Sequence, residues 1–200
     1  MQVTINTEKH QELGFLEPFI IDNLNIISCK NAALEDALKF YAGTLIADRL
    51  KYLSQFLSGT HRHQLVDVKY HSLKEGIVPC IPGWHVDGGP GVPSEYVLCV
   101  AGSSHTEFYT GNLTLSYNGN TKQFCRQMST MIPGPTFALQ DWQIVKYNHL
   151  APHRGGSAEK AGPRLLLRLM ESDTILPTPI GNWQPSYYKH NYEDQNVSRT

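Results

Sequence analysis

The feature that most limits the fold is a series of short β-patterned segments between about residues 61 and 170. They are rich in β-branched, aromatic and leucine residues, and clusters of Gly, Pro or Asn separate them. The expected strands are 65–71, 96–101, 107–110, 113–117, 122–128, 136–139, 143–147 and 164–170. Short strands at regular spacing with turn signals between them indicate a barrel or a sandwich.

The chain before these strands has a helical pattern. Between about residues 31 and 57, apolar side chains recur every three or four positions, and Gly43 marks a point where the segment can divide into two helices. One or two helices followed by about eight strands fit a mainly β, α+β fold, namely a helix-buttressed double-stranded β-helix of the jelly-roll or cupin-like kind. We predict a single domain with a helical buttress (1–60), a double-stranded β-helix core (61–176) and a C-terminal tail (177–200).

Composition excludes several classes of protein. The hydrophobic fraction is 40%, and no apolar run approaches the roughly 20 residues that cross a bilayer. No signal peptide is visible, and four widely separated cysteines suit reduced thiols, so we expect a cytoplasmic protein. The net charge of -1 gives no strong nucleic-acid signal. The composition leaves a small-molecule or side-chain substrate as the expected partner, and the oligomeric state is left open.

The clearest chemical motif is His85-Val-Asp87, which is expected at the end of a strand, before a glycine-rich exit. Residues two apart on a strand share a face, so this imidazole and this carboxylate can grip one metal ion. His153, in Ala-Pro-His-Arg-Gly-Gly, can complete a face of two histidines and one carboxylate. That ligand set leaves one side of the metal open and is typical of non-haem Fe(II) oxygenases.

The His-x-Asp/Glu spacing is not diagnostic by itself. It occurs at 10–12, 85–87 and 105–107, where roughly 0.8 matches are expected by chance. The first match lies before the helical segment, whereas the third lies between two expected strands and is a genuine rival. His149 competes with His153 as the distal ligand. A simple hydrogen-bonded pair at 85–87 is the alternative to a metal site.

Two arginines on the last expected strand add to the metal interpretation. Arg164 and Arg168 follow His153 by eleven and fifteen residues and share one face of the strand. A cation that faces the interior destabilises the fold unless it pairs with an anion, and a guanidinium can bind a carboxylate through two parallel hydrogen bonds. A dicarboxylate that chelates the metal at one end and meets an arginine at the other would explain both features. Alternatively, the arginines face solvent or pair with Glu171 or Asp173.

The order of these motifs resembles the Fe(II)/2-oxoglutarate-dependent dioxygenase superfamily. The resemblance covers roughly residues 65–172, and it includes the stretch 133–139 ahead of the distal histidine. It implies a double-stranded β-helix, Fe(II) as the metal, 2-oxoglutarate as the co-substrate and dioxygen as a further partner. His85, Asp87 and His153 would be the iron ligands.

The same resemblance implies roles for the arginines and a reaction. Arg164 has the offset for holding the distal carboxylate of 2-oxoglutarate, and Arg168 would contact either that carboxylate or an anionic substrate. The reaction would hydroxylate an unactivated C–H bond and release succinate and carbon dioxide. Asp87 argues against halogenation, because halogenating relatives lack the carboxylate. A cupin-like metalloenzyme without 2-oxoglutarate and a non-catalytic jelly-roll binding protein remain the alternatives.

Overall fold

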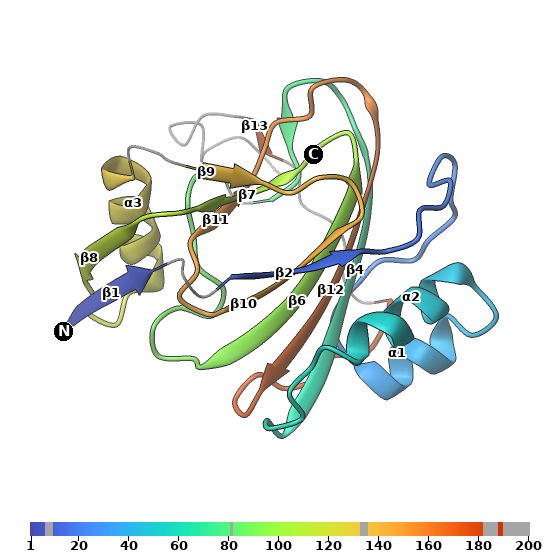
Figure 1. Ribbon diagram of the computed structural model, residues 1–200, viewed down its shortest axis with the longest axis horizontal. Helices are drawn as coiled ribbons and strands as arrows, with labels where there is room; N and C mark the ends of the chain where they lie inside the picture. The colour runs from blue at the N-terminus through green and yellow to red at the C-terminus, as the bar shows by residue number, and fades with distance from the viewer. Residues whose placement is uncertain (7–9, 81, 133–135, 182–187, 190–200) are drawn as a thin grey trace.

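The computed structural model describes residues 1–6, 10–80, 82–132, 136–181 and 188–189, which are mainly β with a few helices (Figure 1). The largest sheet has six antiparallel strands in the order β2-β10-β6-β12-β4-β3. Its strands, in that order, are β2 (Gln11–Phe15), β10 (Gln143–Asn148), β6 (Ser94–Gly102), β12 (Gly162–Ser172), β4 (His63–Leu73) and β3 (Cys29–Ala33).

Three smaller antiparallel sheets complete the β structure of the described residues. The three-stranded one has the order β11-β7-β9, and the others are the pairs β1-β8 and β13-β5. Their bounds are β1 (Gln2–Asn6), β5 (Ile77–Val78), β7 (Thr106–Tyr109), β8 (Asn112–Ser116), β9 (Thr136–Ala138), β11 (His153–Gly155) and β13 (Tyr188–Lys189).

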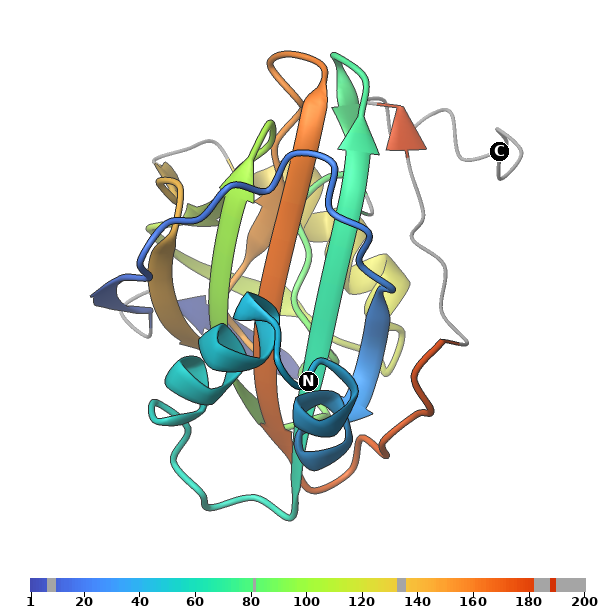
Figure 2. The same cartoon turned by 90° about the vertical axis from the view of Figure 1, so that its right-hand side faces the viewer.

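Strand β12 contributes side chains to the apolar clusters on both faces of the large sheet. Leu165, Leu167 and Leu169 belong to an apolar cluster that also contains residues of the helices α1 (Leu34–Phe40) and α2 (Leu45–Ser54). Figure 2 shows both helices lying across this outer face of the sheet. The sequence analysis is confirmed in placing two helices between residues 31 and 57, divided near Gly43, whose φ is +77°.

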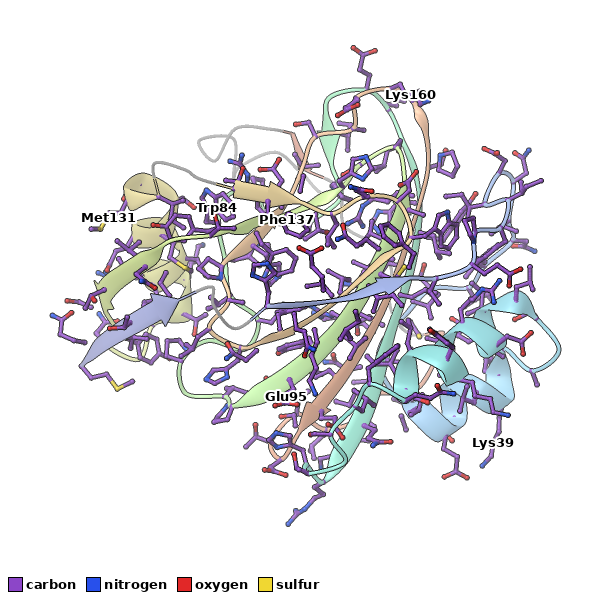
Figure 3. The ribbon with its side chains drawn as sticks, viewed as in Figure 1. Lys39, Trp84, Glu95, Met131, Phe137 and Lys160 are labelled. Atoms are coloured by element: carbon purple, nitrogen blue, oxygen red, sulfur yellow. The ribbon has the colours of Figure 1, made fainter. Side chains whose placement is uncertain are left out.

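The other face of the large sheet meets the three-stranded sheet. Leu98 of β6, Phe108 of β7 and Leu166 of β12 belong to one buried apolar cluster, so side chains of both sheets pack together in the interior. Figure 3 shows side chains filling this space, while exposed cations such as Lys39 and Lys160 lie at the periphery. Residues at even positions of β12 therefore face the space between the two sheets.

The strand expected at 122–128 is wrong, because this segment lies in helix α3 (Thr121–Met131). Asn120, which lies in a Gly/Asn cluster between two expected strands, is the N-cap residue, and its side chain accepts a hydrogen bond from Gln123 N at 3.0 Å. Phe124 and Met128 are both fully buried, and their spacing of four residues suits one face of a helix. Asn serves turns and helix caps equally well, so the local sequence did not separate the two.

Two expectations fall partly outside the described residues. The expected C-terminal tail 177–200 is described for 177–181 and 188–189, and in the stretch 133–139 residues 133–135 lie outside the description. Within the described ranges, no helix has the length and apolar character needed to span a membrane.

Candidate metal centre

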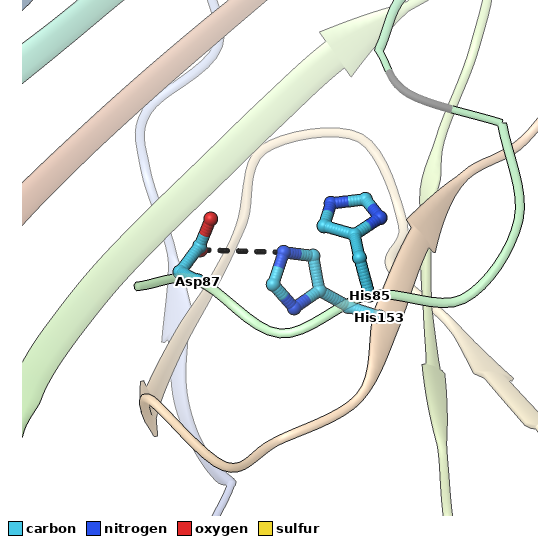
Figure 4. Close-up of side chains that lie close together, drawn as sticks. All are labelled: His85, Asp87 and His153. Atoms are coloured by element: carbon cyan, nitrogen blue, oxygen red, sulfur yellow. Dashed lines mark ion pairs between the residues drawn. The ribbon is translucent and has the colours of Figure 1, made fainter. Parts of the chain in front are cut away.

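The candidate metal centre is built on one β-bridge between distant parts of the chain. His85 N donates to His153 O at 3.0 Å, and His153 N donates to His85 O at 2.9 Å. His153 opens β11, which pairs with β7, so the bridge attaches His85 to the edge of the three-stranded sheet. The two imidazole centroids lie 4.5 Å apart, and Asp87 lies beside them (Figure 4).

The sequence analysis expected His85 at the end of a regular strand, and this expectation is wrong. His85 forms an isolated bridge, with turns on both sides of it. Gly83 and Gly88 have φ values of +85° and +71°, a region that strains residues with a side chain. These glycines allow the chain to present His85 and Asp87 as a short extended piece between two turns.

Both imidazoles are oriented by backbone carbonyl groups. His85 Nδ1 lies 3.1 Å from Gly83 O, and His153 Nδ1 lies 3.0 Å from Ala151 O. A carbonyl oxygen only accepts hydrogen bonds, so each Nδ1 carries a proton and Nε2 is the ring atom that faces a metal. Metal-binding histidines in proteins are fixed in the same way.

The Asp87 carboxylate completes the group. Its Oδ2 accepts hydrogen bonds from Tyr147 OH at 2.9 Å and Arg168 Nη1 at 2.5 Å, and lies 3.3 Å from His153 Nε2. One possible ligand atom from each of His85, Asp87 and His153 lies within 4.8 Å of the others. Two imidazole nitrogens and a carboxylate oxygen form a donor set that suits first-row divalent metals.

The electrostatics of the site keep His85 and Asp87 in the form that a metal requires. Burial, together with nearby His153, lowers the pKa of His85 to about 4, so its ring is neutral at pH 7. Burial by itself would raise the pKa of Asp87, but Arg168 and His153 act more strongly and hold it well below its ordinary value. Asp87 is therefore an ionised carboxylate at neutral pH.

Arg168 contacts the candidate metal centre, but both terminal nitrogens of its guanidinium bind carboxylates of the chain itself. Its Nη1 binds Asp87, and its Nη2 donates to Asp67 Oδ2 at 2.6 Å.

Glu171 and Asp173, the alternative partners of the two arginines in the sequence analysis, form hydrogen bonds with other groups. Glu171 accepts hydrogen bonds from the 58–59 segment, and Asp173 accepts from Arg62 N.

Arg164 is buried on the same face of β12, with 2% of its surface exposed. Its Nε donates to Ser104 O at 2.9 Å, and its Nη2 donates to Thr106 Oγ1 at 3.3 Å. In the part of the chain that the structure describes, no carboxylate forms an ion pair with Arg164. Burial lowers its pKa to about 10, which still leaves it charged at neutral pH. An anion is the natural ligand for such a group.

The rival ligands from the sequence analysis do not join the group of three. Glu12 accepts a hydrogen bond from Gln143, and Glu107 pairs with Arg154 at 2.8 Å. His105 lies 3.8 Å from Asp141, and His10 stacks on Phe108. His149 accepts a hydrogen bond from Ser94 N instead. Of the two distal candidates, His153 is the one beside His85 and Asp87.

Three residues that contact this region were not singled out from the sequence, namely Asp67, Thr106 and Tyr147. A signal for Asp67 was available, because a carboxylate inside an otherwise apolar strand must find a cation. Thr106 and Tyr147 carry no such signal, since threonine and tyrosine are ordinary strand residues.

Comparison with known proteins gives weak likenesses. No protein-family model matches the sequence, and no curated protein matches it. Among solved structures, EvdO2 from Micromonospora carbonacea var. aurantiaca is similar, with 16% identity over 74% of this chain and 70% of that chain, at a TM-score of 0.43. The same protein complexed with 2-oxoglutarate gives 15% identity over 86% and 83% of the two chains, also at 0.43. A likeness of this size does not establish a shared activity.

Proposed function

We propose that this protein is an Fe(II)- and 2-oxoglutarate-dependent oxygenase on a jelly-roll, double-stranded β-helix scaffold. The observation that carries the proposal is the meeting of His85, Asp87 and His153, whose donor atoms lie within 4.8 Å of one another. Two imidazoles whose Nδ1 atoms face backbone carbonyls and one ionised carboxylate form the donor set of non-haem Fe(II) oxygenases. The packing of a large antiparallel sheet against a small one supports the proposed scaffold.

Arg164 supports the choice of co-substrate. It is a buried cation without a carboxylate partner in the described chain, and the Thr106 hydroxyl lies within hydrogen-bond distance of it. A guanidinium and a hydroxyl side by side can bind one carboxylate together. We assign this pair to the distal carboxylate of 2-oxoglutarate, since a dicarboxylate can reach both the metal and a cation.

In this function the residues of the chain bind and orient. His85, Asp87 and His153 would hold Fe(II), and the carbonyls of Gly83 and Ala151 keep both Nε2 lone pairs available. When bound, Fe(II), 2-oxoglutarate and dioxygen together supply the oxidising chemistry that hydroxylates an unactivated C–H bond and releases succinate and carbon dioxide. The apolar side chains between the sheets limit the access of water.

Anaerobic titration of the purified protein with Fe(II), and then with 2-oxoglutarate, tests the proposal. A weak visible charge-transfer band that appears only when both are present would support it. Metal binding that is indifferent to 2-oxoglutarate would favour a cupin-like metalloenzyme instead. Absence of metal binding would leave a non-catalytic binding protein. Succinate formation in air, measured with and without Fe(II), provides a second readout.

A further inference from the structure

The starting observation is that Arg168 is held from several sides. Its Nη1 donates to Asp87 Oδ2 at 2.5 Å, and its Nη2 donates to Asp67 Oδ2 at 2.6 Å. The guanidinium carbon also lies 5.2 Å from the centre of the Tyr96 ring, within the range of a cation–π contact. Because a guanidinium is planar and its donors are fixed, anchoring one end orients the other.

Asp67 is the carboxylate partner of Arg168 that does not belong to the group of His85, Asp87 and His153. It lies directly opposite Arg168 in the register between β4 and β12, and 2% of its surface is exposed. Its Oδ1 accepts a hydrogen bond from Asn31 N at 2.7 Å, and Lys69 Nζ lies 3.3 Å from Oδ2. Both carboxylate oxygens of Asp67 are therefore engaged.

The backbone of β3 is shaped to reach this carboxylate. The pairing of β3 with β4 is irregular between Cys29 and Ala32, and Asn31 has a φ of +52°. Few residues other than glycine adopt this conformation, although asparagine tolerates it. The irregularity places Asn31 N against Asp67, so a continuous chain of contacts runs from the sheet edge through Asp67 and Arg168 to Asp87.

We propose that Asp67 is a positioning residue for the candidate metal centre, and that it acts through Arg168. In this arrangement Asp67 fixes Nη2, the rigid guanidinium places Nη1 against Asp87 Oδ2, and Tyr147 OH holds the same oxygen. No hydrogen bond to Asp87 Oδ1 forms among the described residues, which leaves that oxygen available to a cation. The proposal rests on the proposed function, because it requires Asp87 to be a metal ligand.

The test measures anaerobic binding of Co(II) alone, which reports on ligand geometry through its visible bands. Asp67→Asn, which keeps the size of the side chain and removes its charge, should weaken Co(II) binding roughly 10- to 100-fold and shift the bands. Arg168→Lys should do the same, because an ammonium group cannot hold two carboxylates in a fixed plane. The matched control is Glu171→Gln, which removes another fully buried carboxylate, one that binds the backbone of residues 58–59. This variant should bind Co(II) like the wild type.

The double variant separates positioning from a simple effect of charge. If Asp67 acts through Arg168, then Asp67→Asn should cause no further loss of affinity in the Arg168→Lys background. The proposal would be overturned if Asp67→Asn lowered Co(II) affinity equally in the wild-type and Arg168→Lys backgrounds. It would also be overturned if Glu171→Gln lowered the affinity as much as Asp67→Asn does. If Asp67→Asn does not fold by circular dichroism, Arg168→Lys decides alone, and wild-type affinity would overturn the proposal. A wild-type protein that binds no metal would instead refute the proposed function itself.

Discussion

His153 Nε2 lies 3.3 Å from Asp87 Oδ2, and the Nδ1 proton of the same imidazole is already committed to Ala151 O. Two atoms with lone pairs that face each other at this distance need a positive charge between them. Either a second proton on the ring or a metal ion supplies it, and His85 lies where it can provide a further lone pair. The relationship explains why three polar side chains converge in an interior that is otherwise mainly apolar.

Removing a histidine of the group should abolish tight metal binding. His85→Ala is expected to weaken anaerobic Co(II) or Fe(II) binding on the order of 100-fold or more, since loss of a direct ligand exceeds the effect of its supports. Equilibrium dialysis with metal analysis checks this. His149→Ala is the matched control, because His149 bonds Ser94 N and should leave affinity unchanged. The reverse pattern would show that the metal binds elsewhere.

The two arginines of β12 should differ in their effect on the stability of the metal-free protein. Arg168→Met leaves the buried Asp67 and the partly buried Asp87 without their arginine partner, so the free energy of unfolding should fall by about 3–5 kcal/mol. Arg164→Met removes a buried cation that has no carboxylate partner in the described chain, and the loss should stay below about 1–2 kcal/mol. Urea unfolding with a chelator present measures both variants.

Binding should show a different ranking of the same variants. Arg164→Met should weaken 2-oxoglutarate about 10-fold or more and spare the metal, because it removes a charge-assisted hydrogen bond to the co-substrate. If Arg168→Met alone weakens 2-oxoglutarate while metal affinity is kept, the two roles are reversed.

A larger residue at Gly155 is expected to destabilise the protein, because Cys80 Sγ occupies the space that its Cβ would need. A Cβ at position 155 would lie 2.6 Å from Cys80 Sγ, well inside van der Waals contact. Gly155→Ala should therefore cost about 1–3 kcal/mol of stability, as overpacking generally does. Cys80→Ala removes the sulfur and should restore most of that loss in the double variant, measured by thermal or urea unfolding. If the losses of stability from Gly155→Ala and Cys80→Ala simply added in the double variant, the predicted clash would be contradicted.

Acidification should destabilise the metal-free protein through His71. Burial, with Arg164 nearby, lowers the pKa of His71 to about 3, whereas an unfolded histidine titrates near 6.5. Below pH 6.5 the unfolded chain binds more protons than the native state, so the free energy of unfolding falls as pH falls. At pH 5 this amounts to about 2 kcal/mol. The difference in urea midpoint between pH 7 and pH 5 should shrink in His71→Gln, and an unchanged difference would show that His71 is not responsible.

The sequence by itself put forward the side chains that converge at the candidate centre, with His149 and the match at 105–107 left as rivals. The spacing of His85 and Asp87 and the preference for His153 came from motif context, and the structure brings these three residues together. The helices before the sheet and the inward faces of the last strand also followed, because periods of 3.6 and 2 can be read locally.

The tertiary structure alone decided which partner each inward side chain meets. Periodicity gives the face of a strand but not its neighbour, which depends on the register between strands. The register of β12 with β4 sets Arg168 opposite Asp67 and Arg164 opposite His71, and nothing within β12 encodes that choice. Two arginines that look equivalent in the sequence thus become different groups, one bound between two carboxylates and one without a carboxylate partner among the described residues.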